Sequence, residues 1–434
     1  MPDDSYGLPV TTPSPAAREA YGRGVEGILG WHRDTVGFFR TALEHDPDFA
    51  LAHAGLAVSL FVEERFAEAR ASIDRARALA PGTTPRERSQ IEALGRYVEV
   101  RMREAEALMR EHLAAYPTDL IVAQRLYFIW FFQGRNDEML GLTASLLPRV
   151  PDTSFVLGLH AFVLEELGRC DEALATAETC VERNPEDTWG VHALAHALYE
   201  MAAFDDGLRR LPPAIAGCVN TNYYRNHLLW HVILLHLSRG DYARASAMTH
   251  AVFEREPSPL ALDLRNVIAT LWRFELCGMD VKARWQPFVA IARGLLDRPE
   301  DLPFHHAHIA MALAGGGDWA TAERHLDLLR ARAAGDRAGV LGGVVIPLVE
   351  GLHAFAAGDW RRVITTLEPV RERIIEVGGS RTQRDAFHDT LFEACFRAGD
   401  GERAERVLAE RIARRPDHFW LNRKVATAGH TPNS

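Results

Sequence analysis

The chain has 434 residues and a formal net charge of −10, with no concentration of positive charge. We therefore expect neither nucleic acid nor a membrane as a partner, because both are held by basic surfaces. The sequence contains no run of 18 apolar residues, which a membrane-spanning helix would need. Its N-terminus has no basic segment typical of a secretory signal, so we expect a cytoplasmic protein. Five scattered cysteines without Cys-x-x-Cys spacing predict neither a disulfide framework nor a zinc ribbon.

Prolines recur along the first half of the chain, after residues 1–15, which we expect to be an extended N-terminal segment. Each proline follows a segment rich in Ala, Leu, Glu and Arg. Since proline cannot continue a helix, each marks a gap between helices. They stand 34 to 36 residues apart, at Pro47, Pro81, Pro117, Pro151 and Pro185.

A second break recurs inside each repeat, where glycine precedes Asp or Arg. Glycine ends helices because it accepts a left-handed backbone conformation without a steric penalty. The repeat is therefore helix, short turn, helix, at about 34 residues, which is the tetratricopeptide period. The turn glycines are Gly134, Gly168, Gly240, Gly317, Gly358 and Gly399.

The same pattern predicts helix pairs over residues 261–297, 301–334, 340–376 and 381–415. We expect an all-α, tetratricopeptide-like α-α superhelix of about ten helical hairpins, forming a single domain over residues 16–424. Residues 425–434 are expected to be a flexible tail. One turn departs from the pattern, because residues 200–203 (Glu-Met-Ala-Ala) lack the glycine expected there.

Two His-x-x-x-His pairs lie on strongly helical segments, His192 with His196 and His227 with His231. Residues four apart share one face of a helix, so each pair should project as a unit. The second pair follows the first by one repeat length. We therefore expect the two pairs to lie side by side.

Positions counted from the repeat predict what lines its concave groove. Trp189 and Glu200 should share the inward face of His192 and His196, Tyr224 should join the second pair, and Phe128 belongs to an aromatic and aliphatic wall. His308 and His231 each stand nine residues before a turn glycine, which predicts equivalent inward positions. These groove positions carry no Lys or Arg, which disfavours capture of a peptide carboxylate and favours a small-molecule pocket.

The whole chain resembles the tetratricopeptide repeat protein 38 family. The resemblance implies a helical-repeat fold closed on itself more tightly than an open peptide-binding scaffold, and it implies no particular activity. The family-like positions that could carry function are His192, His196, His227, His231, His308, Arg384 and Asp385. The resemblance rests on residues 46–49, 184–196, 226–227, 230–231, 378–380 and 383–385.

Three interpretations of the paired histidines stay open. They could form a polar network that only stiffens the fold, since neutral imidazoles can satisfy one another. They could bind Zn, Fe or Mn with Glu200 within reach, because imidazoles on adjacent helices suit such ions. They could instead act as metal-free acids and bases, with Arg384 orienting an anionic substrate and Asp385 or Glu200 fixing a tautomer.

Two classes of function follow from these features. The first is a repeat scaffold whose histidine- and aromatic-lined groove binds a protein, a peptide or a small ligand. The second is an enzyme, metal-dependent or not, that acts on a small organic molecule enclosed in that groove. The sequence names no substrate and does not decide between the two classes.

Overall fold

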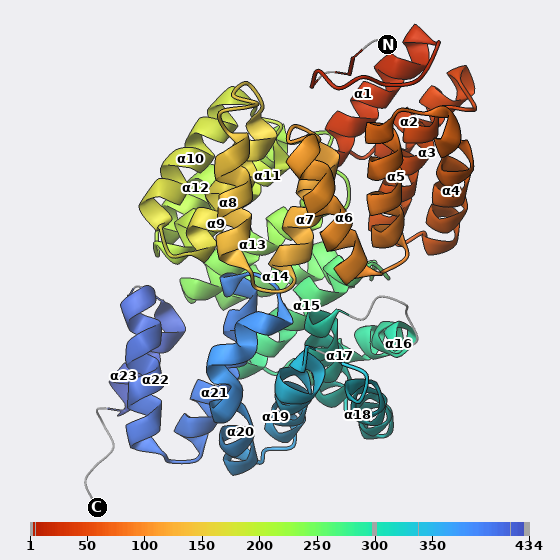
Figure 1. Cartoon of the computed structure of the whole chain (residues 1–434). Helices are drawn as coiled ribbons and strands as arrows, with labels where there is room; N and C mark the ends of the chain where they lie inside the picture. The colour runs from red at the N-terminus through yellow and green to blue at the C-terminus, as the bar shows by residue number, and fades with distance from the viewer. Residues whose placement is uncertain (1–2, 5, 297–301, 337, 417, 429–434) are drawn as a thin grey trace, which may run out of the picture. The chain divides into compact units, whose positions relative to one another are not determined.

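A computed structural model describes residues 3–4, 6–296, 302–336, 338–416 and 418–428. These residues form helices and turns (Figure 1), and the only extended pairing among them is two isolated β-bridges. The predicted all-α class is confirmed. No helix within these ranges is long and apolar enough to cross a membrane.

The chain divides into two compact units. The N-terminal unit comprises Met1–Phe131, Arg135–Leu194 and Ala214–Arg225, and the C-terminal unit comprises the rest. The helices α11 (Thr188–Glu200), α12 (Phe204–Gly217) and α13 (Tyr224–Ser238) each contribute residues to both units. The expectation of a single domain stays a prediction.

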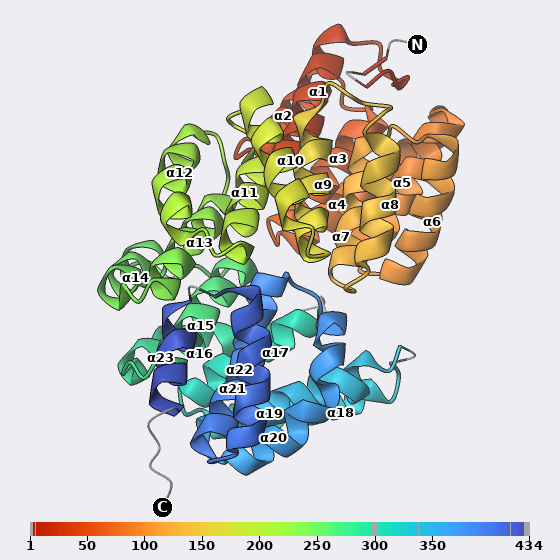
Figure 2. The ribbon, with the colours of Figure 1, turned by 90° about the vertical axis from the view of Figure 1, so that its left-hand side faces the viewer.

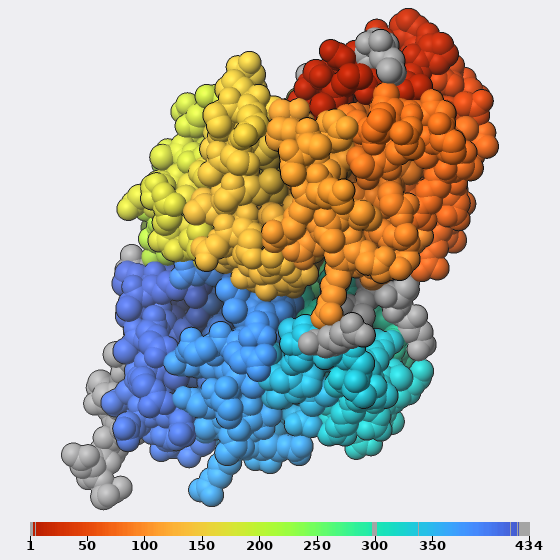
Figure 3. Space-filling model, viewed as in Figure 1, coloured from red at the N-terminus to blue at the C-terminus, as the bar shows by residue number. Residues whose placement is uncertain are grey.

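The N-terminal unit is built from hairpins in which α1 packs against α2, α3 against α4, α5 against α6 and α9 against α10. Figure 2 shows several of these hairpins side by side. In the face drawn in Figure 3, the side chains of the orange segment form a continuous surface. The elements lying wholly in this unit are α1 (Pro15–Gly30), α2 (Thr35–His45), α3 (Ala50–Val62), α4 (Phe66–Leu79), η1 (Ala80–Gly82), α5 (Pro85–Val98), α6 (Met102–Ala115), α7 (Leu120–Phe131), α8 (Asn136–Leu146), α9 (Ser154–Glu166) and α10 (Cys170–Arg183).

The C-terminal unit continues the helix pairs, and each pair predicted between residues 261 and 415 is present. The predicted tail, residues 425–434, falls partly on α23 and otherwise lies outside the described residues. The elements are α14 (Tyr242–Thr249), η2 (His250–Glu254), α15 (Ala261–Leu276), η3 (Lys282–Trp285), α16 (Gln286–Leu295), α17 (Pro303–Gly315), α18 (Trp319–Ala333), η4 (Leu341–Val345), α19 (Ile346–Ala356), α20 (Trp360–Leu367), η5 (Glu368–Val377), α21 (Arg381–Arg397), α22 (Gly401–Arg414) and α23 (Phe419–Ala428).

The turns within hairpins show why the sequence folds in this way. All six predicted turn glycines have positive φ, between 68° and 78°. Where glycine is missing, another residue takes the same conformation, namely Glu64 after α3, Val100 after α5 and Ala202 after α11. The left-handed turn is therefore a property of the repeat, and the glycine only reduces its cost.

Replacing Ala202 by glycine is expected to raise the free energy of unfolding by about 0.5–1 kcal/mol, because the left-handed conformation penalises a Cβ atom. Ala202 has a φ of 56°. The matched control is Ala175→Gly, because Ala175 is exposed in the interior of α10 and is not among the positive-φ residues. It should lower stability by about 0.5–1 kcal/mol. Urea titrations of both variants check the signs, and a loss in Ala202→Gly would contradict the prediction.

Candidate functional site

The helices α11 and α13 carry the two histidine pairs and bring them together. One ring nitrogen from each of His192, His196, His227 and His231 lies within 4.8 Å of the others, and all four side chains are buried. Three of them, His196, His227 and His231, belong to the C-terminal unit. His192 stands one helical turn earlier on α11. The predicted convergence of the two pairs is therefore present in the structure.

The imidazole rings of the C-terminal unit lie in contact. The ring centroids of His196 and His231 are 4.5 Å apart, and those of His227 and His231 are 4.9 Å apart. Burial lowers the pKa of His227 to about 3 against the opposing effect of its hydrogen bond with Asn266. Burial and the adjacent imidazoles also hold the pKa of His231 well below its ordinary value. These two rings are neutral at neutral pH, the form in which imidazole binds metal.

The helix α15 fixes the orientation of His227. Since the amide oxygen of Asn266 can only accept, Nδ1 of His227 donates to it at 3.0 Å, which leaves Nε2 as the nitrogen with a lone pair. Trp230 stacks on the His227 ring at 5.3 Å and donates from Nε1 to Oγ1 of Thr270 at 3.0 Å. The ring of His227 is thus held from its edge and from its face.

Thr382 on α21 connects His196 with a charged group. Its hydroxyl lies 3.5 Å from Nδ1 of His196 and donates to Oε1 of Glu200 at 3.1 Å. Glu200, expected within reach of a metal or as a partner that fixes a histidine tautomer, accepts from Arg414 at 2.6 Å and from Arg415 at 3.0 Å. The structure therefore places Glu200 in an ion-pair network that adjoins the histidines through Thr382.

This buried network joins Glu200, Asp385 and Asp389 to three arginines near the end of α22. Arg411 pairs with Asp385 at 2.5 Å and with Asp389 at 2.6 Å, and Arg414 reaches Asp385 at 2.8 Å. Burial opposes ionisation of Glu200, but Arg415 and Arg414 outweigh it and lower the pKa to about 2. The arginines likewise hold the pKa of Asp385 well below its ordinary value, whereas burial raises the pKa of Asp389. Charge pairing therefore determines which carboxyl groups ionise here.

The aromatic residues expected to line a groove are buried around Trp31, which the sequence analysis did not single out. Within the N-terminal unit, Trp31 stacks on Trp189 with ring centroids 5.9 Å apart. It also contacts Tyr224 at 4.6 Å and Phe128 at 5.8 Å. The protein's own chain thus covers this wall at Trp31, and the expectation that Trp189, Tyr224 and Phe128 contact a ligand stays a prediction.

Backbone pairing holds the segment that carries Trp31. The amide of Asn222 donates to the carbonyl of Trp31 at 2.9 Å, and the amide of Arg33 donates to the carbonyl of Asn220 at 2.8 Å. His32 and Thr221 form one of the two β-bridges. Gln124 on α7 donates to the carbonyl of Leu29 at 3.2 Å. Residues 29–33 are therefore anchored at both helix α7 and the loop before α13.

The remaining expected residues lie elsewhere in the C-terminal unit. His308 on α17 pairs through Nδ1 with the carbonyl of Phe304 at 2.9 Å and packs on Phe387 at 5.8 Å, and it is not part of the four-histidine group. Arg384 donates to the carbonyl of Gly379, and Asp385 belongs to the ion-pair network. The equivalence of His308 and His231 in the repeat therefore does not bring their rings into one site.

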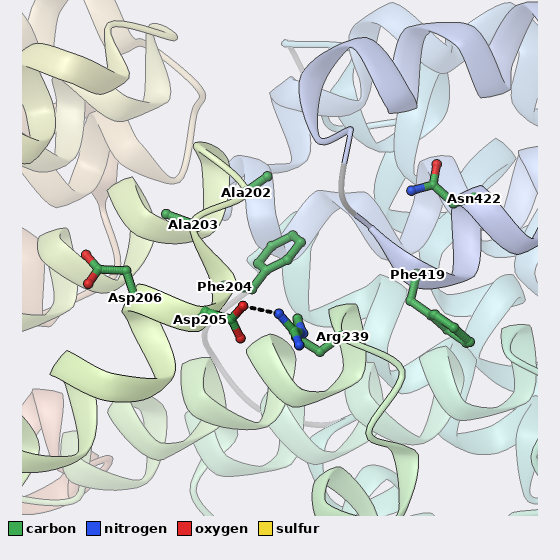
Figure 4. Close-up of a pocket in the computed structure, with 8 residues that line it drawn as sticks. All are labelled: Ala202, Ala203, Phe204, Asp205, Asp206, Arg239, Phe419 and Asn422. Atoms are coloured by element: carbon green, nitrogen blue, oxygen red, sulfur yellow. Dashed lines mark hydrogen bonds and ion pairs between the residues drawn. The ribbon is translucent and has the colours of Figure 1, made fainter.

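A wide, open cavity of about 520 Å³ lies in the C-terminal unit and contains none of the histidines (Figure 4). Its lining includes Phe204 and an ion pair between Asp205 and Arg239. Phe419, which is 41% exposed, also contributes. This cavity is separate from the candidate site on α11 and α13.

The helix hairpins and their period of about 34 residues define a tetratricopeptide-like helical-repeat protein. No family model matches the chain. Similar solved structures include Naa15/Naa10 bound to HypK-THB, at 13% identity over 95% of this chain and 65% of that chain, with a TM-score of 0.27. The APC/C hetero-tetramer Cut9-Hcn1 is 12% identical over 96% of this chain and 78% of that chain, with a TM-score of 0.39.

The human IFIT1 dimer with m7Gppp-AAAA is also similar, at 12% identity over 98% of this chain and 96% of that chain, with a TM-score of 0.46. The chain spans about two thirds of the length of the Naa15/Naa10 structure's matched chain, at 65%. At such identities and scores these likenesses carry no argument about function. The class of fold rests on the hairpins themselves.

Proposed function

We propose that this chain is a helical-repeat protein of the tetratricopeptide repeat protein 38 family that binds a divalent transition metal ion through its buried histidines. The observation that carries the proposal is the convergence of His196, His227 and His231, with His192, to within 4.8 Å of one another. Neutral imidazole suits Zn²⁺ and Fe²⁺, and helices hold such ligands in fixed geometry.

The surroundings of His227 support metal binding over a purely structural network. Metal-bound histidines commonly donate their second ring nitrogen to an acceptor, which fixes the tautomer and the ring orientation. The bond from Nδ1 of His227 to Asn266 is of this kind, and it leaves Nε2 as the nitrogen with a lone pair. Trp230 excludes water from one face of the ring.

The number of histidines that bind the ion separates a structural role from a catalytic one. Four imidazoles would close a tetrahedral site, whereas three leave a position for water, as in catalytic zinc sites. His192 is the residue that decides between these arrangements. The enzyme alternative, acting on a small organic molecule, therefore centres on the same histidines as the metal-binding proposal.

Full-length protein purified without chelator or a nickel column is expected to contain about one transition metal ion per chain, measured by elemental mass spectrometry. His227→Ala and His231→Ala should remove the metal, because each deletes a ligand. Asn266→Ala should weaken binding by about 10–100-fold, the usual effect of removing a hydrogen-bond partner of a ligand. His308→Ala is the matched control, since His308 is equally buried and lies outside the group.

A wild-type protein that holds no metal and takes up none of Zn²⁺, Fe²⁺ or Mn²⁺ on titration would refute this proposal. The histidines would then be a polar network, and a partner-binding scaffold would be the function to pursue. If metal binds, His192→Ala separates the two arrangements. Loss of metal in that variant supports the four-ligand site, and retention supports the three-ligand site with an open position.

A further inference from the structure

A second cavity, of about 170 Å³, lies in the C-terminal unit where η5, α21 and the end of α22 meet. Its lining contains four arginines, one histidine and a single carboxylate. The formal charge of this lining is +3 with the histidine neutral, although the chain as a whole carries −10. The charged residues that line it are Arg371, Arg381, Arg384, Arg414, His388 and Glu372.

Two of these arginines are held in place by ion pairs with carboxylates. Arg371 pairs with Glu410 at 2.6 Å and with Glu372 at 2.8 Å. Arg414 pairs with Glu200 at 2.6 Å and with Asp385 at 2.8 Å. Because such pairs restrict the side chains, their guanidinium groups are positioned before any ligand arrives.

Arg384 is only 5% exposed and donates to the neutral carbonyl of Gly379. Gly379 and Gly378 both have positive φ, so the backbone turns sharply between η5 and α21 at this point. This turn brings Arg381 and Arg384 of α21 to the same cavity as Arg371 of η5.

We propose that this cavity binds the phosphate group of a small phosphorylated molecule. A guanidinium presents a planar fork that matches phosphate oxygens, and four guanidinium groups against a single carboxylate line this cavity. The volume is below the roughly 300–1,000 Å³ typical of pockets for whole drug-sized ligands. The cavity therefore takes an anionic group, and the rest of the molecule extends outside it. This inference does not depend on metal binding by the histidines.

His388 offers a direct sensor of occupancy. Burial, together with Arg411, Arg384 and Arg414, lowers its pKa to about 3 against the opposing effect of Asp385. The negative charge of a phosphate anion in the cavity would counter the arginines. Phosphate is therefore expected to raise this pKa, which NMR of the imidazole protons would detect.

The test is calorimetric titration of inorganic phosphate into the full-length protein at low ionic strength, with chloride at equal ionic strength as the reference. One saturable site is expected. Arg381→Gln and Arg384→Gln should each weaken binding by at least about tenfold, the usual effect of losing a hydrogen bond to a charged group. The matched control is Arg373→Gln, because Arg373 lies on η5, pairs with Glu376 and does not line the cavity.

Absence of saturable phosphate binding in the wild type would overturn the inference. So would an equal loss in Arg373→Gln, which would indicate only diffuse surface charge, or tighter binding of malonate, which would indicate a carboxylate site. If Arg384→Gln fails to fold, the half-buried Arg381→Gln variant and the His388 signal decide the outcome. A His227→Ala variant that keeps its phosphate affinity would show that this site stands apart from the proposed metal site.

Discussion

Replacing Arg415 by methionine is expected to lower the free energy of unfolding by about 3–5 kcal/mol, the cost of removing one partner from a buried ion pair. The Arg415 side chain is 1% exposed, pairs with Glu200 at 3.0 Å and also pairs with Asp385. Its guanidinium lies over the ring of Tyr199 at 4.6 Å. Methionine keeps much of the aliphatic stem, so the loss reports mainly on charge pairing. Chemical denaturation measures it.

Arg406→Met is the matched control, because Arg406 pairs with Glu368 at 3.0 Å but is 50% exposed. An exposed pair of this kind contributes about 0–1 kcal/mol. Similar losses in the two variants would show that the buried network does not stabilise the fold.

The acid dependence of stability gives an independent readout of the network. The pKa of Glu200 is lowered from an ordinary value of 4.5 to about 2, so its ionised form stabilises the folded state above pH 4.5. That contribution is lost as the pH falls from about 5 towards 2. In Arg415→Met the shift should be smaller, and the fall in stability over this window should be shallower. An unchanged slope would indicate that Arg415 does not set the pKa of Glu200.

Replacing Trp31 by alanine is expected to lower the free energy of unfolding by about 3 kcal/mol, at the lower end of the range for tryptophan because this side chain is only partly buried. The substitution removes the rings' contacts with Trp189, Tyr224 and Phe128. It should also expose these aromatic side chains to solvent. Urea titration followed by circular dichroism measures the loss, and binding of a hydrophobic dye reports the exposed wall.

Trp319→Ala makes the same chemical change at a site that is 41% exposed, and it should cost less than about 1 kcal/mol. A Trp31→Ala variant as stable as Trp319→Ala would mean that the aromatic side chains close over the gap without Trp31. Because the chain has two units, it can unfold in more than one transition, and each unfolding transition should be compared separately between the two variants.

The features predictable from the sequence were those that recur with the repeat. The turn glycines and the helix pairs between residues 261 and 415 are confirmed, because a fixed period reports local helix geometry. The convergence of the paired histidines followed from the same period.

The features that could not be predicted from the sequence depend on contacts between residues that the repeat period does not relate. Trp31 meets Tyr224 across most of the N-terminal unit's sequence, and Asn266 and Thr382 reach the histidines from α15 and α21. In the sequence, Arg414 and Arg415 indicate only the C-terminal end of a helix, where basic residues are common because they interact favourably with the helix dipole. In α12 the helix continues through Pro212 and Pro213, where local rules predict a break.

The segment around Trp31 also bears on how the protein is made. Repeat arrays usually fold by adding each hairpin to its neighbour, so early repeats can be complete while later ones are still being synthesised. Here Arg33 bonds to Asn220, 187 residues further along the chain. The first hairpin therefore cannot complete its contacts until the ribosome has released the residues before α13.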